Sequence, residues 1–237
     1  MNLPDGLLQP PFAHRGLWAP GEAAENSLAA IERACQSGYG VEFDVRLTRD
    51  DEVVVFHDET LERMAGLELA VADLTLGELE GVLLQGGPDR IPTLQQVLNL
   101  VAGRAMMLIE LKAAPDPMAL ADRIAVLLEH YSGPLAAISF DAAALAWFGT
   151  RRPDTPRGLD AMWDADYEAE ARNELERQVA QSQPHFLVLE KSAAMGPLAA
   201  EHRLKGLPVI AWTMRSTDDV DLVADHVDNF IFEGFTA

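Results

Sequence analysis

The stretch GVEFDVRL, residues 40–47, decides the fold of this chain. Apolar side chains alternate in it with Glu42 and Asp44, and this period of two predicts a β-strand with both carboxylates on one face. A second apolar run, at residues 53–57, follows after only the short segment 48–52. Because a parallel crossover needs about a dozen residues, we expect the second run to fold back as an antiparallel hairpin arm.

Short apolar runs recur along the chain and alternate with stretches of helical spacing, the pattern of repeated βα units. Eight runs besides the hairpin arm are expected to be parallel strands, at residues 11–14, 40–47, 106–111, 135–140, 157–161, 186–190, 209–213 and 229–233. Helices are predicted at residues 27–36, 93–101, 118–130, 142–148, 168–181, 193–202 and 218–224. This pattern predicts an α/β fold, a single (β/α)8 TIM barrel over residues 1–237, with residues 58–92 as a small insertion after strand two.

The charge of the chain limits its partners. Its 237 residues carry 38 Asp and Glu against 18 Lys and Arg, a formal net charge of −20. Such a charge repels polyanions, which argues against nucleic acid or an anionic membrane as the main partner. An anionic ligand is then expected to be a small molecule, held where a cation or basic side chains reverse the local field.

The expected location is the cytoplasm. The single cysteine, Cys35, has no partner for an intramolecular disulfide, so nothing in the sequence requires an oxidising compartment. The first residues lack a basic region followed by an apolar one, so no signal peptide is predicted. No membrane span is predicted either, since no apolar run approaches about 18 residues.

Three carboxylates are expected to meet at one end of the barrel. Glu110 and Lys112 repeat the spacing of Glu42 and Asp44 on the next parallel strand. Acids that face inward together repel each other and are costly to desolvate unless a cation joins them. Such an oxygen-rich site suits Mg²⁺, Ca²⁺ or Mn²⁺ rather than zinc. The alternative is a buried ion network in which the acids pair with basic side chains, namely Arg15, Arg46 and Lys112.

Two histidines occupy strand ends. His14 ends the first strand, and His57 ends the hairpin arm, which returns it toward His14. Two imidazoles that titrate near neutral pH suit general acid and general base duties across one phosphoester bond. Arg15 offers a planar fork matched to phosphate oxygens, Gly16 allows close backbone approach, and Lys112 adds a point charge. The sequence therefore indicates a site that cleaves a phosphoester.

In this order, these residues resemble the glycerophosphodiester phosphodiesterase family. The matching segments are His-Arg-Gly at 14–16, Glu-Asn at 25–26, Glu-Phe-Asp-Val at 42–45, Val-Phe-His-Asp at 55–58, Ile-Glu-Leu-Lys at 109–112 and, more weakly, Ile-Ser-Phe at 138–140 and Ala-Trp-Thr at 211–213. The resemblance spans most of the chain. It implies a (β/α)8 barrel enzyme that hydrolyses small glycerophosphodiesters, the deacylated phospholipids, to an alcohol and glycerol 3-phosphate.

The resemblance also implies a role for each matching position. The implied acid and base are His14 and His57, the implied metal ligands Glu42, Asp44 and Glu110, and the implied phosphate contacts Arg15 and Lys112. Trp212 would line the organic portion of the substrate or be a buried core tryptophan. Glu25 would be a further metal ligand or the partner that holds Arg15.

Three features depart from the family's pattern, and the last two bear on substrate preference. Ala24 stands in place of a common proline and is expected to alter only loop stiffness, Arg215 stands in place of a common asparagine, and residues 232–235 stand in place of a loop that usually contains aspartate. Lys191, Arg215 and Glu233 all fall at strand ends. We expect them to shape the pocket for the glycerol or the leaving group, unless they form structural ion pairs.

Two other functions stay open. One is a phosphodiesterase that acts on a lysophospholipid or a sphingolipid diester, which an exposed apolar rim in the insertion would favour. The other is a catalytically idle barrel that binds a phosphorylated metabolite, although such a binder has no need of paired imidazoles beside three acids. The sequence does not select the alcohol, the metal ion, the nucleophile (water or a glycerol hydroxyl) or the oligomeric state.

Overall fold

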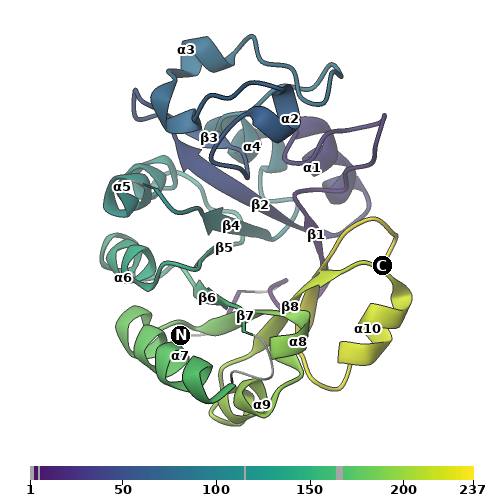
Figure 1. Ribbon diagram of the computed structural model, residues 1–237, viewed down its shortest axis with the longest axis vertical. Coiled ribbons are helices and arrows are strands. Elements are labelled where there is room, and N and C mark those ends of the chain that lie inside the picture. Colours follow the sequence, from purple (N-terminus) through teal and green to yellow (C-terminus); the bar gives the residue numbers. More distant parts are fainter. Residues whose placement is uncertain (1–2, 5, 115, 164–167) are drawn as a thin grey trace.

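Eight parallel strands close into a barrel in the computed structural model, which describes residues 3–4, 6–114, 116–163 and 168–237 (Figure 1). The strands are β1 (Phe12–His14), β2 (Gly40–Leu47), β4 (Met107–Leu111), β5 (Leu135–Ser139), β6 (Arg157–Ala161), β7 (Phe186–Glu190), β8 (Val209–Met214) and β9 (Asn229–Phe232). β1 pairs in parallel with both β2 and β9, and this closes the sheet. The predicted TIM barrel is confirmed.

The hairpin arm forms as predicted. β3 (Val53–Val55) pairs antiparallel with β2, with Val45 opposite Val55. The backbone N–H of Thr48 donates to the carbonyl of Glu52 at 2.9 Å and closes the turn between the two strands. The arm therefore carries His57 back toward the middle of β2.

Helices surround the barrel on its outer side (Figure 1). They are α1 (Leu28–Gln36), α4 (Leu94–Val101), α5 (Pro117–Leu127), α6 (Ala142–Arg151), α7 (Glu168–Ser182), α8 (Lys191–Ala194), α9 (Pro197–Leu204) and α10 (Thr217–Val223). Side chains begin several of them: Ser27 Oγ accepts from Ala30 N at 3.1 Å, and Thr93 forms a reciprocal capping box with Gln96.

The single helix expected at residues 193–202 is instead two helices, and that prediction was wrong. α8 ends at Ala194, and α9 begins at Pro197 with Gly196 as its N-cap. Proline has no N–H to donate and its ring clashes with the carbonyl four residues before it, so a helix cannot run through Pro197 undisturbed.

The insertion at residues 58–92 lies beside the mouth of the barrel rather than across it. It contains α2 (Glu62–Ala65), the 3-10 helix η1 (Val71–Asp73) and α3 (Leu76–Leu79). Its apolar residues form their own cluster with Val54 of the arm. None of them lines the central pocket described below.

The core has two apolar layers. Val41 and Phe43 point outward from β2 into the layer beneath the helices. The amino-terminal half of the barrel interior is filled by a second cluster that includes Phe12 and Phe186. A Cβ on Gly158 would lie 2.3 Å from the Phe186 ring, so glycine is needed there for the ring to fit. No helix in the described ranges is both long and apolar enough to cross a membrane.

Candidate active site

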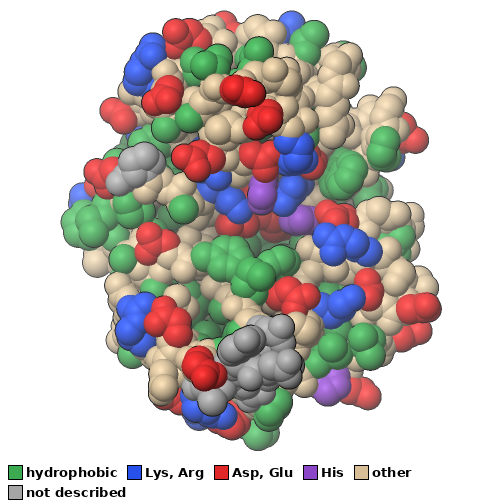
Figure 2. Space-filling model, viewed as in Figure 1, with side chains coloured by type: hydrophobic (Ala, Val, Ile, Leu, Met, Phe, Trp, Pro, Cys, Tyr) green, Lys and Arg blue, Asp and Glu red, His purple; other side chains and the backbone are tan. Residues whose placement is uncertain are grey.

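The acidic residues meet at the carboxyl ends of β2 and β4. Glu42 and Asp44 face the barrel interior, and Asp44 lies opposite Glu110 in the strand register. One oxygen of each carboxylate lies within 4.8 Å of those of the other two, and all three residues are buried. In Figure 2, histidine side chains lie near the middle of the visible face, among basic and acidic side chains and above apolar ones, and another histidine lies near the lower right edge. The carboxylates thus converge as the sequence predicted.

The charges of these acids are not balanced by hydrogen bonds alone. Burial first, then the negative charges of Asp44 and Glu110, raise the pKa of Glu42 well above its ordinary value. Burial and Asp44 raise the pKa of Glu110 to about 7. Burial also opposes ionisation of Asp44, but the positive charges of Lys112 and Arg15 outweigh it and lower the Asp44 pKa. Glu42 Oε1 and Asp44 Oδ1 are buried without a hydrogen-bond partner among the described residues. This donor set fits a divalent cation bound by oxygen ligands.

Arg15 enters the site from a sharp turn after β1. Its φ is 57°, and Gly16 follows with a φ of 80°. A Cβ on Gly16 would lie 2.7 Å from the carbonyl carbon of Ala30, so no larger residue fits this turn. The turn directs the backbone N–H of Arg15 to Glu42 Oε2 at 3.1 Å. The Arg15 side chain reaches Asp44, with Arg15 Nε 3.4 Å from Asp44 Oδ2.

Lys112 completes a partial ion network. Its Nζ lies 2.8 Å from Glu110 Oε1 and 3.5 Å from Asp44 Oδ1. Arg46 does not join this network, because its Nε and Nη2 donate to the carbonyl of His57 at 2.9 and 2.7 Å. The alternative interpretation is therefore met for Arg15 and Lys112 and wrong for Arg46, and Glu42 Oε1 still accepts no hydrogen bond from any described residue.

Both histidines are oriented by a carboxylate at Nδ1. His14 Nδ1 lies 2.6 Å from Glu233 Oε2, and His57 Nδ1 lies 2.6 Å from Asp58 Oδ1. His14 Nε2 lies 3.9 Å from Glu42 Oε2. Burial lowers the pKa of His57, although the negative charge of Asp44 acts in the opposite direction. With Nδ1 engaged, Nε2 of each ring is the nitrogen left for a reacting group.

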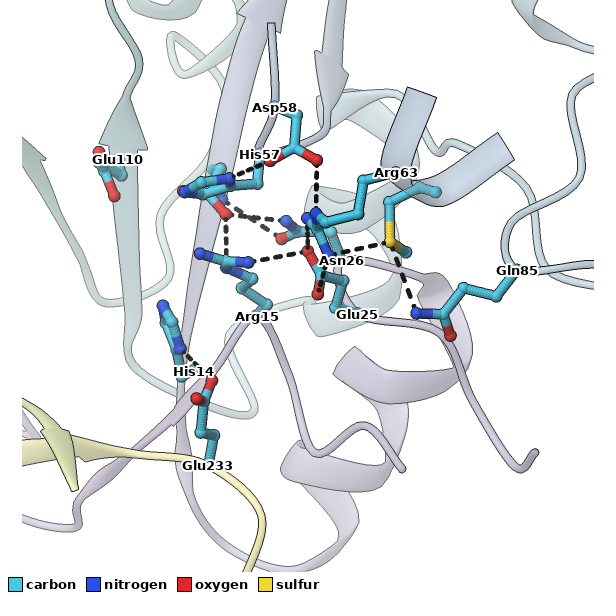
Figure 3. A network of polar contacts seen from close by, with 12 residues as sticks. His14, Arg15, Glu25, Asn26, His57, Asp58, Arg63, Gln85, Glu110 and Glu233 are labelled. Carbon is cyan, nitrogen blue, oxygen red and sulfur yellow. Dashed lines mark hydrogen bonds and ion pairs between the residues drawn. The ribbon is translucent and has the colours of Figure 1, made fainter. Parts of the chain in front are cut away.

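A chain of ion pairs braces this side of the site (Figure 3). Glu25 Oε1 accepts from Arg15 Nη1 at 2.8 Å and from Arg63 Nη2 at 2.6 Å. Arg63 Nε also donates to Asp58 Oδ2 at 2.6 Å, which connects the chain to His57. Glu25 is therefore the partner that holds Arg15, whereas the three acids whose oxygens lie close together are Glu42, Asp44 and Glu110.

These groups line a pocket of about 150 Å³ at the barrel mouth. Its walls are His14, Arg15, Glu42, His57, Glu110, Lys112, Ile138, Phe140, Asp160, Trp212, Thr213, Arg215 and Ile231. A larger pocket of about 590 Å³ shares Glu110, Lys112 and Phe140 with it and extends toward α6 and α7. Trp212 thus lies in the pocket wall.

Sequence reasoning missed part of the site. Asp58, Arg63 and Asp160 had no assigned role, although Asp58 directly follows His57 and Asp160 interrupts an apolar strand. The strand-end residues left undecided form ion pairs: Lys191 Nζ lies 2.5 Å from Asp219, and Arg215 Nε lies 2.9 Å from Glu233.

Comparison with known proteins gives a consistent picture. A model of the Glycerophosphoryl diester phosphodiesterase family matches residues 14–231. The YhdW protein of Bacillus subtilis is 29% identical over 216 residues, which cover 86% of each chain. A glycerophosphodiester phosphodiesterase of Caldanaerobacter subterraneus is 39% identical over 112 residues, which span 43% of this chain and 44% of that protein.

A solved structure shares the fold. The phosphodiesterase of Oleispira antarctica, in complex with the product sn-glycerol-3-phosphate, matches with a TM-score of 0.79 and 24% identity. The match covers 94% of this chain and 91% of that one. At this identity, the likeness supports the barrel architecture.

Proposed function

The chain belongs to the glycerophosphoryl diester phosphodiesterase family, and we propose that it cleaves glycerophosphodiesters with a divalent cation and two histidines. The family that the motifs indicated is thus confirmed, and with it an enzyme that hydrolyses phosphodiesters. The observation that carries the mechanism is the convergence of two carboxylate-anchored imidazoles and three buried acids on one small pocket. The products would be an alcohol and glycerol 3-phosphate, the product bound by the Oleispira protein.

Glu42, Asp44 and Glu110 would hold the cation, which we expect to be Mg²⁺, Ca²⁺ or Mn²⁺. When bound, the ion would polarise a phosphate oxygen and offset negative charge that develops on the phosphoryl group. Glu42 Oε1 and Asp44 Oδ1, which are buried and accept no hydrogen bond within the described ranges, support this assignment. Arg15 and Lys112 would contact the remaining phosphate oxygens, as a planar fork and a point charge.

His14 and His57 would divide the proton transfers. One imidazole takes the proton of the attacking oxygen, which belongs to water or to a glycerol hydroxyl, and the other protonates the departing alkoxide. Their carboxylate partners, Glu233 and Asp58, hold each ring with Nε2 available. Trp212 would line the organic part of the substrate.

We also propose that residues 1–237 form one (β/α)8 domain, with 58–92 as its insertion. The single cysteine remains consistent with the cytoplasm as the proposed location. The partner would be a small glycerophosphodiester rather than a nucleic acid, in keeping with the net charge of −20.

An assay of purified protein tests this function. It would be offered glycerophosphocholine, glycerophosphoethanolamine and glycerophosphoinositol with each divalent ion or with EDTA, and scored for released glycerol 3-phosphate. Turnover that is abolished by EDTA and restored by one of the ions is expected. Activity that survives chelation would contradict the role of the metal ion. Turnover of a lysophospholipid, with none of the three glycerophosphodiesters cleaved, would show that the substrate is a lysophospholipid instead. Binding of glycerol 3-phosphate without turnover of any diester would indicate the idle barrel.

A further inference from the structure

Asp160 is a buried carboxylate to which the proposed mechanism gives no role. Its neighbours in β6, Leu159 and Ala161, pack outward beneath the helices, so Asp160 faces the barrel interior. It is only 3% exposed, and it lines the active-site pocket. Below it, Gly158 leaves room for the Phe186 ring, which closes the floor.

On balance, the surroundings of Asp160 disfavour its charged form. Burial, followed by the negative charge of Glu110, raises its pKa well above the ordinary value. Ile138 and Ile231 belong to the apolar cluster of the interior and also line the pocket. An acid kept at such a cost in a pocket is typical of a functional group.

Trp212 presents an unsatisfied donor next to this acceptor. Trp212 and Asp160 both line the inner pocket, and the Trp212 side chain helps to stabilise the charged form of Asp160. The Trp212 Nε1 is buried and makes no hydrogen bond to any residue in the described ranges. The pair therefore offers one acceptor and one donor to a ligand in the pocket.

We propose that Asp160 and the Trp212 indole N–H form a subsite that binds a hydroxyl group of the glycerol moiety. A hydroxyl donates one hydrogen bond and accepts another, so it satisfies both groups, whereas an ammonium ion would leave the indole without an acceptor. The inner pocket of about 150 Å³ suits a small polyol, and the adjoining pocket of about 590 Å³ has room for the alcohol. This assignment rests on the proposed function.

Calorimetric titration of the cation-loaded protein tests the subsite. The ligands are sn-glycerol 3-phosphate, n-propyl phosphate, which lacks the hydroxyls, and inorganic phosphate. In Asp160→Ala we expect the affinity for glycerol 3-phosphate to fall about 10- to 100-fold, as for a buried polar group that loses its hydrogen-bond partner. The affinities for the other two ligands should change less than about twofold. Asp160→Asn, which keeps the shape and one acceptor oxygen, should show a smaller loss of the same selectivity.

The outcomes separate this subsite from other roles. Equal weakening of all three ligands would mean that Asp160 supports the phosphate and metal groups, and unchanged binding in both variants would mean that it binds nothing; either overturns the proposal. Asp154→Asn, an exposed position, is the matched control, and thermal melting verifies folding. A wild-type protein that binds glycerol 3-phosphate selectively but cleaves no diester would refute the proposed function and leave the subsite standing. If Asp160→Asn lost turnover of glycerophosphocholine but not of the other two diesters, Asp160 would instead bind the choline cation, and the proposal would be overturned.

Discussion

His14 and His57 have the same geometry at the ring but different support behind it. Each Nδ1 lies 2.6 Å from a carboxylate oxygen. Asp58, the partner of His57, is held by Arg63, which also binds the buried Glu25. Glu233, the partner of His14, is held by Arg215, whose side chain is 66% exposed. One histidine is therefore braced by the insertion and the other by a loop near the end of the described chain.

The difference shows that two histidine rings can have the same orientation although the ion pairs that support them differ in burial. An exposed ion pair contributes little because solvent screens it, whereas a buried acceptor that loses its donor is costly. The orientation of His57 should therefore be more stable in the intact protein than that of His14. Removal of Arg63 should also destabilise the protein more than removal of Arg215.

The largest effect is expected from removing either ring. His14→Ala and His57→Ala should each lower kcat by about 10²–10⁴-fold, the usual contribution of a general acid or base. Single-turnover kinetics with glycerophosphocholine measures this. His130→Ala, on the exposed surface, should be neutral. Near-normal turnover in both active-site variants would mean that these histidines are not the acid and base.

Removal of the anchoring charges should have the next largest effect. Asp58→Asn and Glu233→Gln keep the side-chain shape but replace the acceptor that fixes the Nδ1–H tautomer. We expect a loss of about 10- to 100-fold in kcat for each, by analogy with outer-shell partners of functional histidines. A neutral result at one position would show that its histidine does not depend on its carboxylate.

The two arginines distinguish the braces directly. Arg63→Gln should lower the free energy of unfolding by about 1–3 kcal/mol, because Glu25 is buried and retains only Arg15. Arg215→Gln should change it by less than about 1 kcal/mol, as for an exposed ion pair. Urea unfolding of both variants provides the comparison, and equal losses would contradict the difference between the two sides.

The smallest effect concerns the titration of His57. Burial lowers its pKa from the ordinary value of 6.5, while the hydrogen bond that its Nδ1–H donates to Asp58 raises it. Asp58→Asn should therefore lower the pKa further, so that the ring loses its proton at a more acidic pH. An NMR titration of the imidazole signals would detect this shift. Glu233→Gln should leave the His57 pKa unchanged, and a rise in Asp58→Asn would reverse the assigned role of Asp58.

The features that could be predicted are those that depend on local sequence patterns. The alternation at 40–47 gave both the strand and the shared face of Glu42 and Asp44, and the parallel sheet then brought Glu110 beside them. Pro197 marks the break between α8 and α9 in the sequence, but the helical spacing of the flanking residues conceals it.

The unpredicted part depends on contacts between distant segments. Glu233 meets His14 across 219 positions, and no spacing rule connects them. Asp160 is an ordinary polar residue of a short strand by its sequence, because its importance arises from sharing one pocket with Glu110 and Trp212 inside the closed barrel. Arg63 likewise became relevant only once the insertion had folded beside the arm.

The apolar cluster beneath the site leaves the pocket open only at the mouth of the barrel. Phe12, Phe186 and their neighbours leave no passage through the amino-terminal half of the barrel in the described part of the chain, as in other barrels with packed interiors. Incoming diester and both outgoing fragments must then share the same exit. In the proposed subsite, the glycerol fragment would lie against Asp160 behind the alcohol and would depart last, so accumulated sn-glycerol 3-phosphate should compete with fresh substrate, while free alcohol should not.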